Sequence, residues 1–270
     1  MQSEGSPKRP SVFESAADQA NYRVPDKSIV SCLGHGDAAV LCVTSGKIGR
    51  RGCTAAVGST VFWLTCPYLN NIVARFERHG AVAALQKLIL EDRAVSMAHV
   101  ASHSFYENRV RELLDKEQWE FFYKHFVSGA ANSSGARRYG NAAVSHATDL
   151  KCLHALVAQT MCGAPNPIGD AIVQFIFFLS DEVDILQRNQ CPTPTPGADV
   201  RNGGDTTKIP LDELSVLVKF VKDWIHKSVS DENRGLRVPV SGDELCSSAC
   251  KVVTFLEGRP PRRRRKCRIN

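Results

Sequence analysis

The pattern of apolar and polar positions along the chain changes its period at about residue 65. Before that point, short Val-rich apolar segments alternate with glycine-containing turns, which is typical of strands in a small antiparallel sheet. These segments cover residues 28–33, 38–44 and 55–64. Beyond residue 65, apolar side chains recur at helical spacing. The sequence therefore predicts an α+β fold, in which a small N-terminal antiparallel sheet packs on a predominantly helical body.

Helices are predicted over most of the chain that follows. Their bounds come from capping residues, apolar faces and terminal glycines. The predicted helices cover about residues 65–80, 82–90, 93–114, 115–126, 149–163, 167–186, 210–229 and 241–258. Thr65 and Asp149 are the expected N-caps of two of them, and Ser241 with Glu244 forms a capping box. Residues 129–147 are expected to form a long loop.

Composition divides the chain into five parts. Residues 1–27 are polar and contain prolines, which predicts a disordered N-terminal segment. Residues 28–187 form the predicted α+β domain, and residues 188–209, with three prolines and three glycines from 189 onward, form the predicted linker. An appended pair of helices at residues 210–258 and a basic tail at residues 259–270 complete the chain.

The net charge of +6 is concentrated in the tail. Residues 259–270 hold seven Lys or Arg, which leaves 27 basic and 28 acidic side chains in the other 258 residues. Because residues 1–258 are nearly neutral, this part of the chain is not expected to bind nucleic acid. Nucleic acid is therefore expected only as a partner of the tail. The tail also has the composition of a nuclear-import signal.

No signal peptide and no membrane span are expected from the sequence. The first residues lack the apolar core of a signal peptide, and no apolar run approaches the roughly 18 residues that a bilayer requires. A cytoplasmic protein is the expectation, with nuclear localisation through the Arg-rich tail as the alternative.

The ten cysteines include two that stand out. Cys66 and Cys152 are each expected in the first turn of a helix, where free N–H groups and the helix dipole stabilise a thiolate. Two such thiols could form a metal site, a redox pair or a nucleophilic site. A metal site, for which zinc is the candidate ion, would join them to His154 and one further ligand. That further ligand is open among Cys32, His35 and Cys162. Residues 152 and 154 lie about 200° apart on a regular helix, so they share one ion only if that turn is irregular.

Buried thiols that pack at helix ends are the structural alternative to this metal site, because free cysteine behaves as a small apolar residue.

A second group of candidate residues lies on the predicted helix 93–114. His99 and His103 are four residues apart, and Tyr106 is on the same side. His103 is the candidate general base or anion ligand, with Arg109 as the anion partner and Tyr106 beside it as the third catalytic candidate. The alternative is a polar helix face that contacts the long loop. A metalloprotease motif is absent because no Glu follows His99.

Two motifs resemble a known family. One is Val61-Phe62-Trp63-Leu64-Thr65-Cys66-Pro67-Tyr68-Leu69, and the other is Leu150-Lys151-Cys152-Leu153-His154-Ala155-Leu156-Val157-Ala158 with the following Asn166-Pro167-Ile168-Gly169-Asp170. His103, Tyr106 and Arg109 match a weaker pattern between them. Over about residues 28–180 the chain resembles the family called domain of unknown function number 501, known mainly from bacteria. The family supplies no established activity, so the resemblance implies no reaction.

Two functional hypotheses remain open. The first is a Cys/His site that binds a metal or an anion and acts in an enzyme; it predicts that Cys66, Cys152, His154 and His103 converge within roughly 4–8 Å. The second is a non-catalytic binding or scaffold protein, with a protein partner at the C-terminal helices and the tail as a nucleic-acid or localisation element. Phosphate-loop, dinucleotide and serine-elbow motifs are absent.

Overall fold

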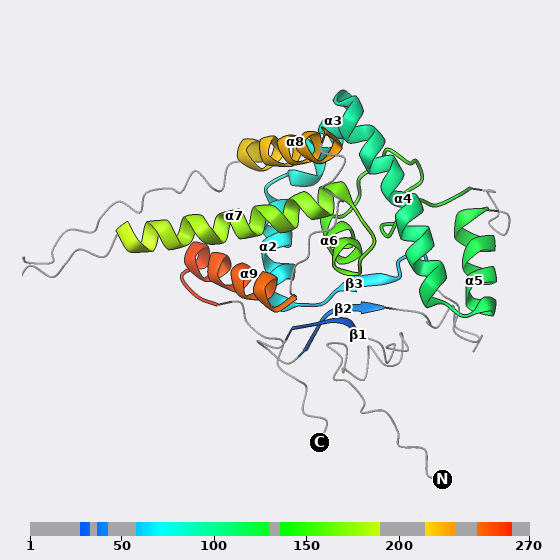
Figure 1. The fold of residues 1–270 in the computed structure, drawn as a ribbon, viewed down its shortest axis with the longest axis horizontal. Coiled ribbons are helices and arrows are strands. Elements are labelled where there is room, and N and C mark those ends of the chain that lie inside the picture. Colours follow the sequence, from blue (N-terminus) through cyan, green and yellow to red (C-terminus); the bar gives the residue numbers. More distant parts are fainter. Residues whose placement is uncertain are drawn as a thin grey trace, which may run out of the picture.

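The structure, a computed structural model, describes residues 28–32, 37–42, 58–129, 136–189, 214–230 and 242–260. The strands are β1 (Ser28–Cys32), β2 (Asp37–Cys42) and β3 (Phe62–Leu64). The helices are α2 (Pro67–Arg78), α3 (Ala81–Glu91), α4 (Arg93–Leu113), α5 (Lys116–Phe122), the π-helix η1 (Tyr123–Val127), α6 (Leu153–Met161), α7 (Pro167–Asn189), α8 (Leu214–Ser230) and α9 (Gly242–Glu257). The predicted α+β class is confirmed (Figure 1).

The sheet is antiparallel, with the strand order β1-β2-β3, and lies below the helices in Figure 1. Residues 39–42 of β2 are all buried. The third strand is shorter than the predicted 55–64: residues 58–61 are not part of it, and residues 55–57 lie outside the described part. Just before the strand, the N–H of Val61 bonds to the side chains of Asn141 and Tyr106.

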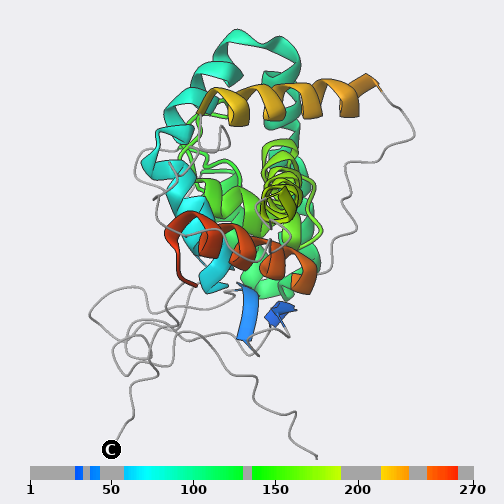
Figure 2. The ribbon, with the colours of Figure 1, turned by 90° about the vertical axis from the view of Figure 1, so that its left-hand side faces the viewer.

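Helix α7 forms the axis of the helical body. Viewed end-on in Figure 2, it lies between α8 on one side and α9 on the other. On the α8 side, the ring of Phe175 packs against Phe220 with ring centroids 5.2 Å apart. On the α9 side, Leu245 and Val252 are buried in the same hydrophobic core as Ile176 of α7. The two C-terminal helices therefore share one core with the rest of the body.

The predicted domain divisions stay predictions. Residues 1–27 and 261–270 lie outside the described part, as do residues 190–209. Helix α7 extends to Asn189 and so occupies the first two positions of the predicted linker. Ser241, the expected cap of the last helix, also lies outside the described residues. Among the described helices, none has the length and apolarity that would be needed to cross a bilayer.

Two predicted N-caps are wrong. Helix α2 begins at Pro67 with Cys66 as its N-cap, and Thr65 lies one residue further out. Helix α6 begins at Leu153 with Cys152 as its N-cap. Asp149 does not cap α6, because its carboxylate accepts hydrogen bonds from the backbone N–H and the ring of His146 instead.

Candidate metal centre

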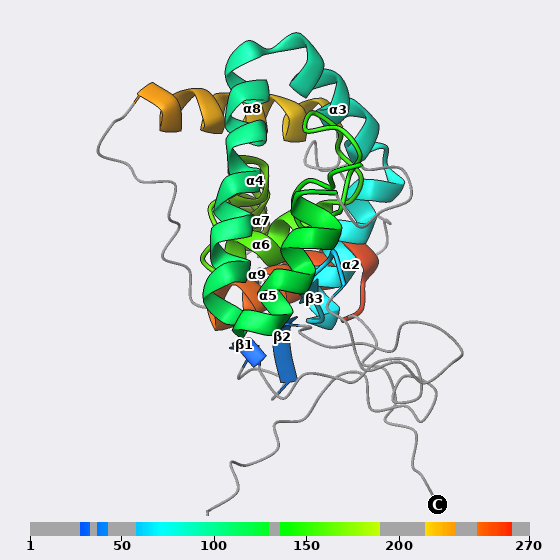
Figure 3. The ribbon, with the colours of Figure 1, turned by 90° about the vertical axis from the view of Figure 1, so that its right-hand side faces the viewer.

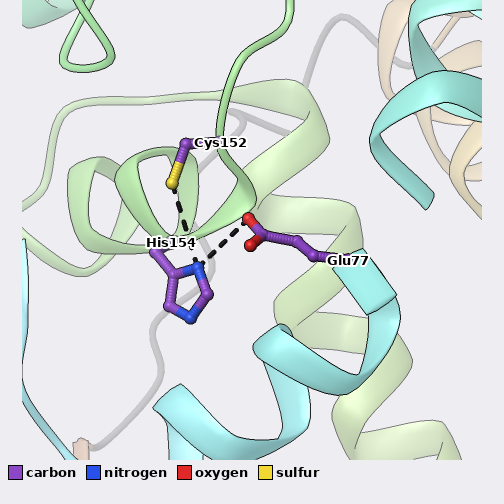
Figure 4. A group of neighbouring side chains, drawn as sticks. All are labelled: Glu77, Cys152 and His154. Atoms are coloured by element: carbon purple, nitrogen blue, oxygen red, sulfur yellow. Dashed lines mark hydrogen bonds and ion pairs between the residues drawn. The ribbon is translucent and has the colours of Figure 1, made fainter. Parts of the chain in front are cut away.

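Helices α2 and α6 bring three metal-ligating side chains together (Figure 4). Glu77 lies in the last turn of α2, Cys152 is the N-cap of α6, and His154 is the second residue of α6. The His154 Nδ1 atom lies 3.9 Å from Cys152 Sγ and 3.1 Å from Glu77 Oε1. All three ligand atoms lie within 4.8 Å of one another. The cluster is therefore formed by side chains from two helices.

The irregular start of α6 explains how Cys152 and His154 face the same point. Cys152 has an extended backbone, with φ −155° and ψ 123°, and regular helix begins only at Leu153. The separation of about 200° applies only when both residues lie inside a regular helix, and Cys152 lies outside it. Cys152 and His154 could share one ion only if the first turn were irregular, and this condition is met.

Glu77 is the member of the group that sequence reasoning missed. Its Oε1 accepts a hydrogen bond of 2.7 Å from the N–H of Leu153, so it satisfies a free donor at the start of α6. One signal was available: an acid in the last turn of a helix is unfavourable beside the negative end of the dipole. The positive end of the α6 dipole offsets that cost. The proximity of α6 to α2 depends on the tertiary structure, so the sequence alone does not reveal it.

The ring orientation of His154 follows from its second nitrogen. Nε2 lies 3.3 Å from the carbonyl oxygen of Asn70, which can only accept, so Nε2 carries a hydrogen. Nδ1 is left facing Cys152 and Glu77. Burial alone would lower the pKa of His154, but hydrogen bonds to Cys152 and Glu77 outweigh burial and raise this pKa to about 10.

The carboxyl of Glu77 responds in the opposite sense. Burial would raise its pKa, but the hydrogen bonds from His154 and from the N–H of Leu153 outweigh burial and hold the pKa below its ordinary value. At neutral pH, a metal-free site therefore contains an ion pair, with a proton held between the imidazole and the carboxylate.

The group does not have the geometry of a cysteine nucleophile with a histidine base and an orienting acid. In such a triad the acid binds one ring nitrogen and the nucleophile the other. Here Cys152 and Glu77 both approach Nδ1 of His154, and Nε2 is bonded to a backbone carbonyl. The three donor atoms converge on one point instead.

Two of the three separations between these donor atoms are close to those in a zinc site. Bonds of about 2.3 Å to sulfur and about 2.0 Å to nitrogen and oxygen place tetrahedral ligand atoms about 3.6 Å apart for S···N and about 3.3 Å for N···O. The observed separations of 3.9 and 3.1 Å are close to both. The side chains of His154 and Glu77 are 24% and 25% exposed, so an ion can reach them from solvent.

The other predicted metal ligands are placed differently. Cys66 is completely buried at the start of α2 and is not one of the three grouped ligands found among the described residues. Cys32 ends β1, and its side chain lies outside the described part. The structure thus brings together two of the four predicted ligands, Cys152 and His154.

The three predicted catalytic residues lie along α4, which crosses the face seen in Figure 3. Tyr106 is buried, and its hydroxyl donates to the carbonyl of Ser59 at 2.8 Å. Arg109 donates from Nε to the carbonyl of Cys162 at 2.9 Å, at the end of α6. In this structure both side chains hold backbone groups, and their predicted catalytic roles stay predictions.

His103 and its neighbour His99 contact the loop that precedes α6. We call residues 147–152 of that loop the strap. Nε2 of His103 lies 2.8 Å from the carbonyl of Ala147, and Nε2 of His99 lies 3.2 Å from that of Asp149. The alternative in which these histidines form a polar face against the loop therefore describes their contacts.

Both histidines are neutral at ordinary pH. Burial, followed by the nearby His103, lowers the pKa of His99 to about 4, and burial also lowers the pKa of His103. Their Nδ1 atoms are buried without a hydrogen-bond partner. A Cβ on Gly140 would lie 2.6 Å from Nδ1 of His103, and Gly140 has φ +61°, so both the conformation and the contact require glycine.

The fold and the site define an α+β protein with a Glu/Cys/His cluster at the junction of two helices. The family model described as Protein of unknown function (DUF501) matches residues 29–174, more than half of the chain, and the chain belongs to this family. The match contains all three clustered residues. Comparisons with curated proteins and with solved structures gave no match.

Proposed function

We propose that the protein binds one zinc ion through Glu77, Cys152 and His154. The observation that carries the proposal is the approach of a thiol, an imidazole nitrogen and a carboxylate oxygen to within 4.8 Å of one another. Three protein ligands leave one tetrahedral position for water or a substrate, which is the arrangement of catalytic rather than structural zinc.

The choice of zinc rests on the donor set. A thiolate ligand disfavours magnesium and calcium, which prefer oxygen atoms. Imidazole and thiolate together suit zinc and its first-row neighbours, and zinc accepts a carboxylate as a third ligand. Groups around the ligands support the same choice, because the Asn70 carbonyl fixes the ring of His154 as outer partners of metal-bound histidines do.

The direct test is zinc content. Protein prepared without chelators is expected to hold one equivalent of zinc by elemental analysis, and Cys152→Ser and His154→Ala are each expected to weaken zinc binding at least about a hundredfold, because each removes a ligand. Cys250→Ala removes another partly buried thiol and is the matched control. Cys66→Ala tests the ligand that the sequence favoured.

A wild-type protein that binds zinc no more tightly than Cys152→Ser does would overturn the proposal. Loss of zinc in Cys66→Ala at unchanged folding would instead enlarge the ligand set.

Zinc affinity is expected to rise with pH. In the metal-free protein His154 keeps its proton up to a pKa of about 10, and zinc must displace that proton. The affinity should therefore increase about tenfold per pH unit for each proton displaced, between pH 6 and pH 9. Calorimetry in buffers of different ionisation enthalpy measures the proton release directly, and an affinity that is flat with pH would contradict the role of His154.

A further inference from the structure

The strap that carries Cys152 is held by side chains rather than by a neighbouring strand. Gln86 of α3 makes two of these contacts with the two ends of a single amide group. Its Nε2 donates to the carbonyl of Thr148 at 3.0 Å, and its Oε1 accepts from the N–H of Leu150 at 2.6 Å. This is the pairing that an adjacent strand would offer, supplied here by one side chain.

The contacts of Gln86 fix the strap next to the metal site. Leu150 lies two residues before Cys152, and Leu153, one residue after it, donates its N–H to Glu77. The short segment with Cys152 is thus fixed on one side by α3 and on the other by α2. A shift of the strap on α3 would move the sulfur atom relative to the other two ligands.

We infer that Gln86 is a positioning residue, which sets the place of the Cys152 sulfur relative to His154 and Glu77. The inference rests on the proposed zinc site. The hydrogen bonds of Gln86 to Thr148 and Leu150 involve none of the three ligands, so its effect passes through the strap. Removal of a group that orients a metal ligand typically weakens metal binding 10- to 100-fold.

The variant Gln86→Glu tests the inference with little change in size. The new carboxylate can still accept from Leu150, but an oxygen replaces the donor that faces the carbonyl of Thr148, and two acceptors repel. Val253→Ala, in the buried face of α9, is the control for a general loss of stability. Zinc affinity and the sulfur-to-cobalt charge-transfer band of the Co²⁺-loaded protein are measured in all three proteins.

Gln86→Glu is expected to bind zinc at least about tenfold more weakly and to show a weaker charge-transfer band. Val253→Ala, compared at a similar loss in Tm, should keep the wild-type affinity and band. Wild-type affinity and an unchanged band in Gln86→Glu would overturn the inference.

A metal-free measurement separates this inference from the proposed function. The amide resonance of Leu153 reports its bond to Glu77. If wild-type protein binds no metal, the proposed function fails, and the resonance still decides the position of the strap. A selective shift of that resonance in Gln86→Glu supports the positioning role, and an unshifted resonance overturns it.

Discussion

Asn141→Ala is expected to lower the free energy of unfolding by about 5 kcal/mol, since four buried hydrogen bonds are lost at once. Asn141 is completely buried in the loop before α6. Its Oδ1 accepts from the N–H groups of Val61 and Phe62, and its Nδ2 donates to the carbonyls of Phe62 and Ala155. One side chain thus joins β3 to α6.

The magnitude follows from the groups left behind. Each buried backbone group without a partner costs about 1–3 kcal/mol, and some of the four would regain water or a shifted partner. Urea-induced unfolding measures the change. Asn108→Ala, at an exposed position of α4, is the matched control and should change stability by less than about 0.5 kcal/mol. A loss below about 1 kcal/mol for Asn141→Ala would show that the four bonds are not formed.

The second large effect is expected at Asp170, in the first turn of α7. Asp170→Asn should stabilise the protein by about 2–4 kcal/mol at pH 8 and by much less at pH 5. Asp170 is 1% exposed, and neither carboxylate oxygen makes a hydrogen bond of ordinary geometry. Burial raises the pKa of Asp170 to about 7, an effect that the hydroxyl of Thr160 opposes.

The direction follows from proton binding. The folded protein keeps the Asp170 proton between the unfolded pKa of 3.8 and the folded pKa of about 7, so stability falls as the pH rises through this range and stays low above it. A difference of about three pKa units corresponds to about 4 kcal/mol. Asparagine does not ionise, so this loss of stability with rising pH is absent in Asp170→Asn. The buried amide at this position would also be without a hydrogen-bond partner, as the carboxylate oxygens of Asp170 are.

Urea unfolding at pH 5, 6.5 and 8 measures the effect, with Asp181→Asn, an exposed carboxylate on the same helix, as the control. Parallel pH profiles for wild type and Asp170→Asn would exclude an ionisation of Asp170 coupled to folding.

The sequence predicted the helical framework well because periodic apolar faces are local signals. The apolar face of Leu69, Ile72 and Phe76 lies on α2, and Asp115, at the start of the predicted helix 115–126, is the N-cap of α5. Helix starts near residues 65 and 149 were misplaced by one and three residues. At Asp149, competition from His146 for the carboxylate decides the outcome, and such competition depends on how the loop is folded.

The candidate site was predicted in part. Cys152 could be selected because its place near the start of a helix is a local signal, and His154 follows it in the same short motif. Glu77 could not, because it is separated from His154 by 77 residues, and the same limit applies to Gln86, which acts 62 and 64 residues away. These contacts exist only once α2 and α3 pack beside the loop and α6. The contact of His103 with the carbonyl of Ala147, 44 residues away, likewise depends on how the helices and the loop pack.

The packing of α8 and α9 on α7 has a practical consequence for any fragment of this protein. The family match ends at residue 174, inside α7, whereas the core continues through Ile176, Leu179 and Val183. A polypeptide cut at the family boundary would sever its axial helix and expose the apolar surfaces that α8 and α9 cover. Recombinant expression should extend to Glu257, because the hydrophobic core includes residues of α8 and α9 beyond the matched region.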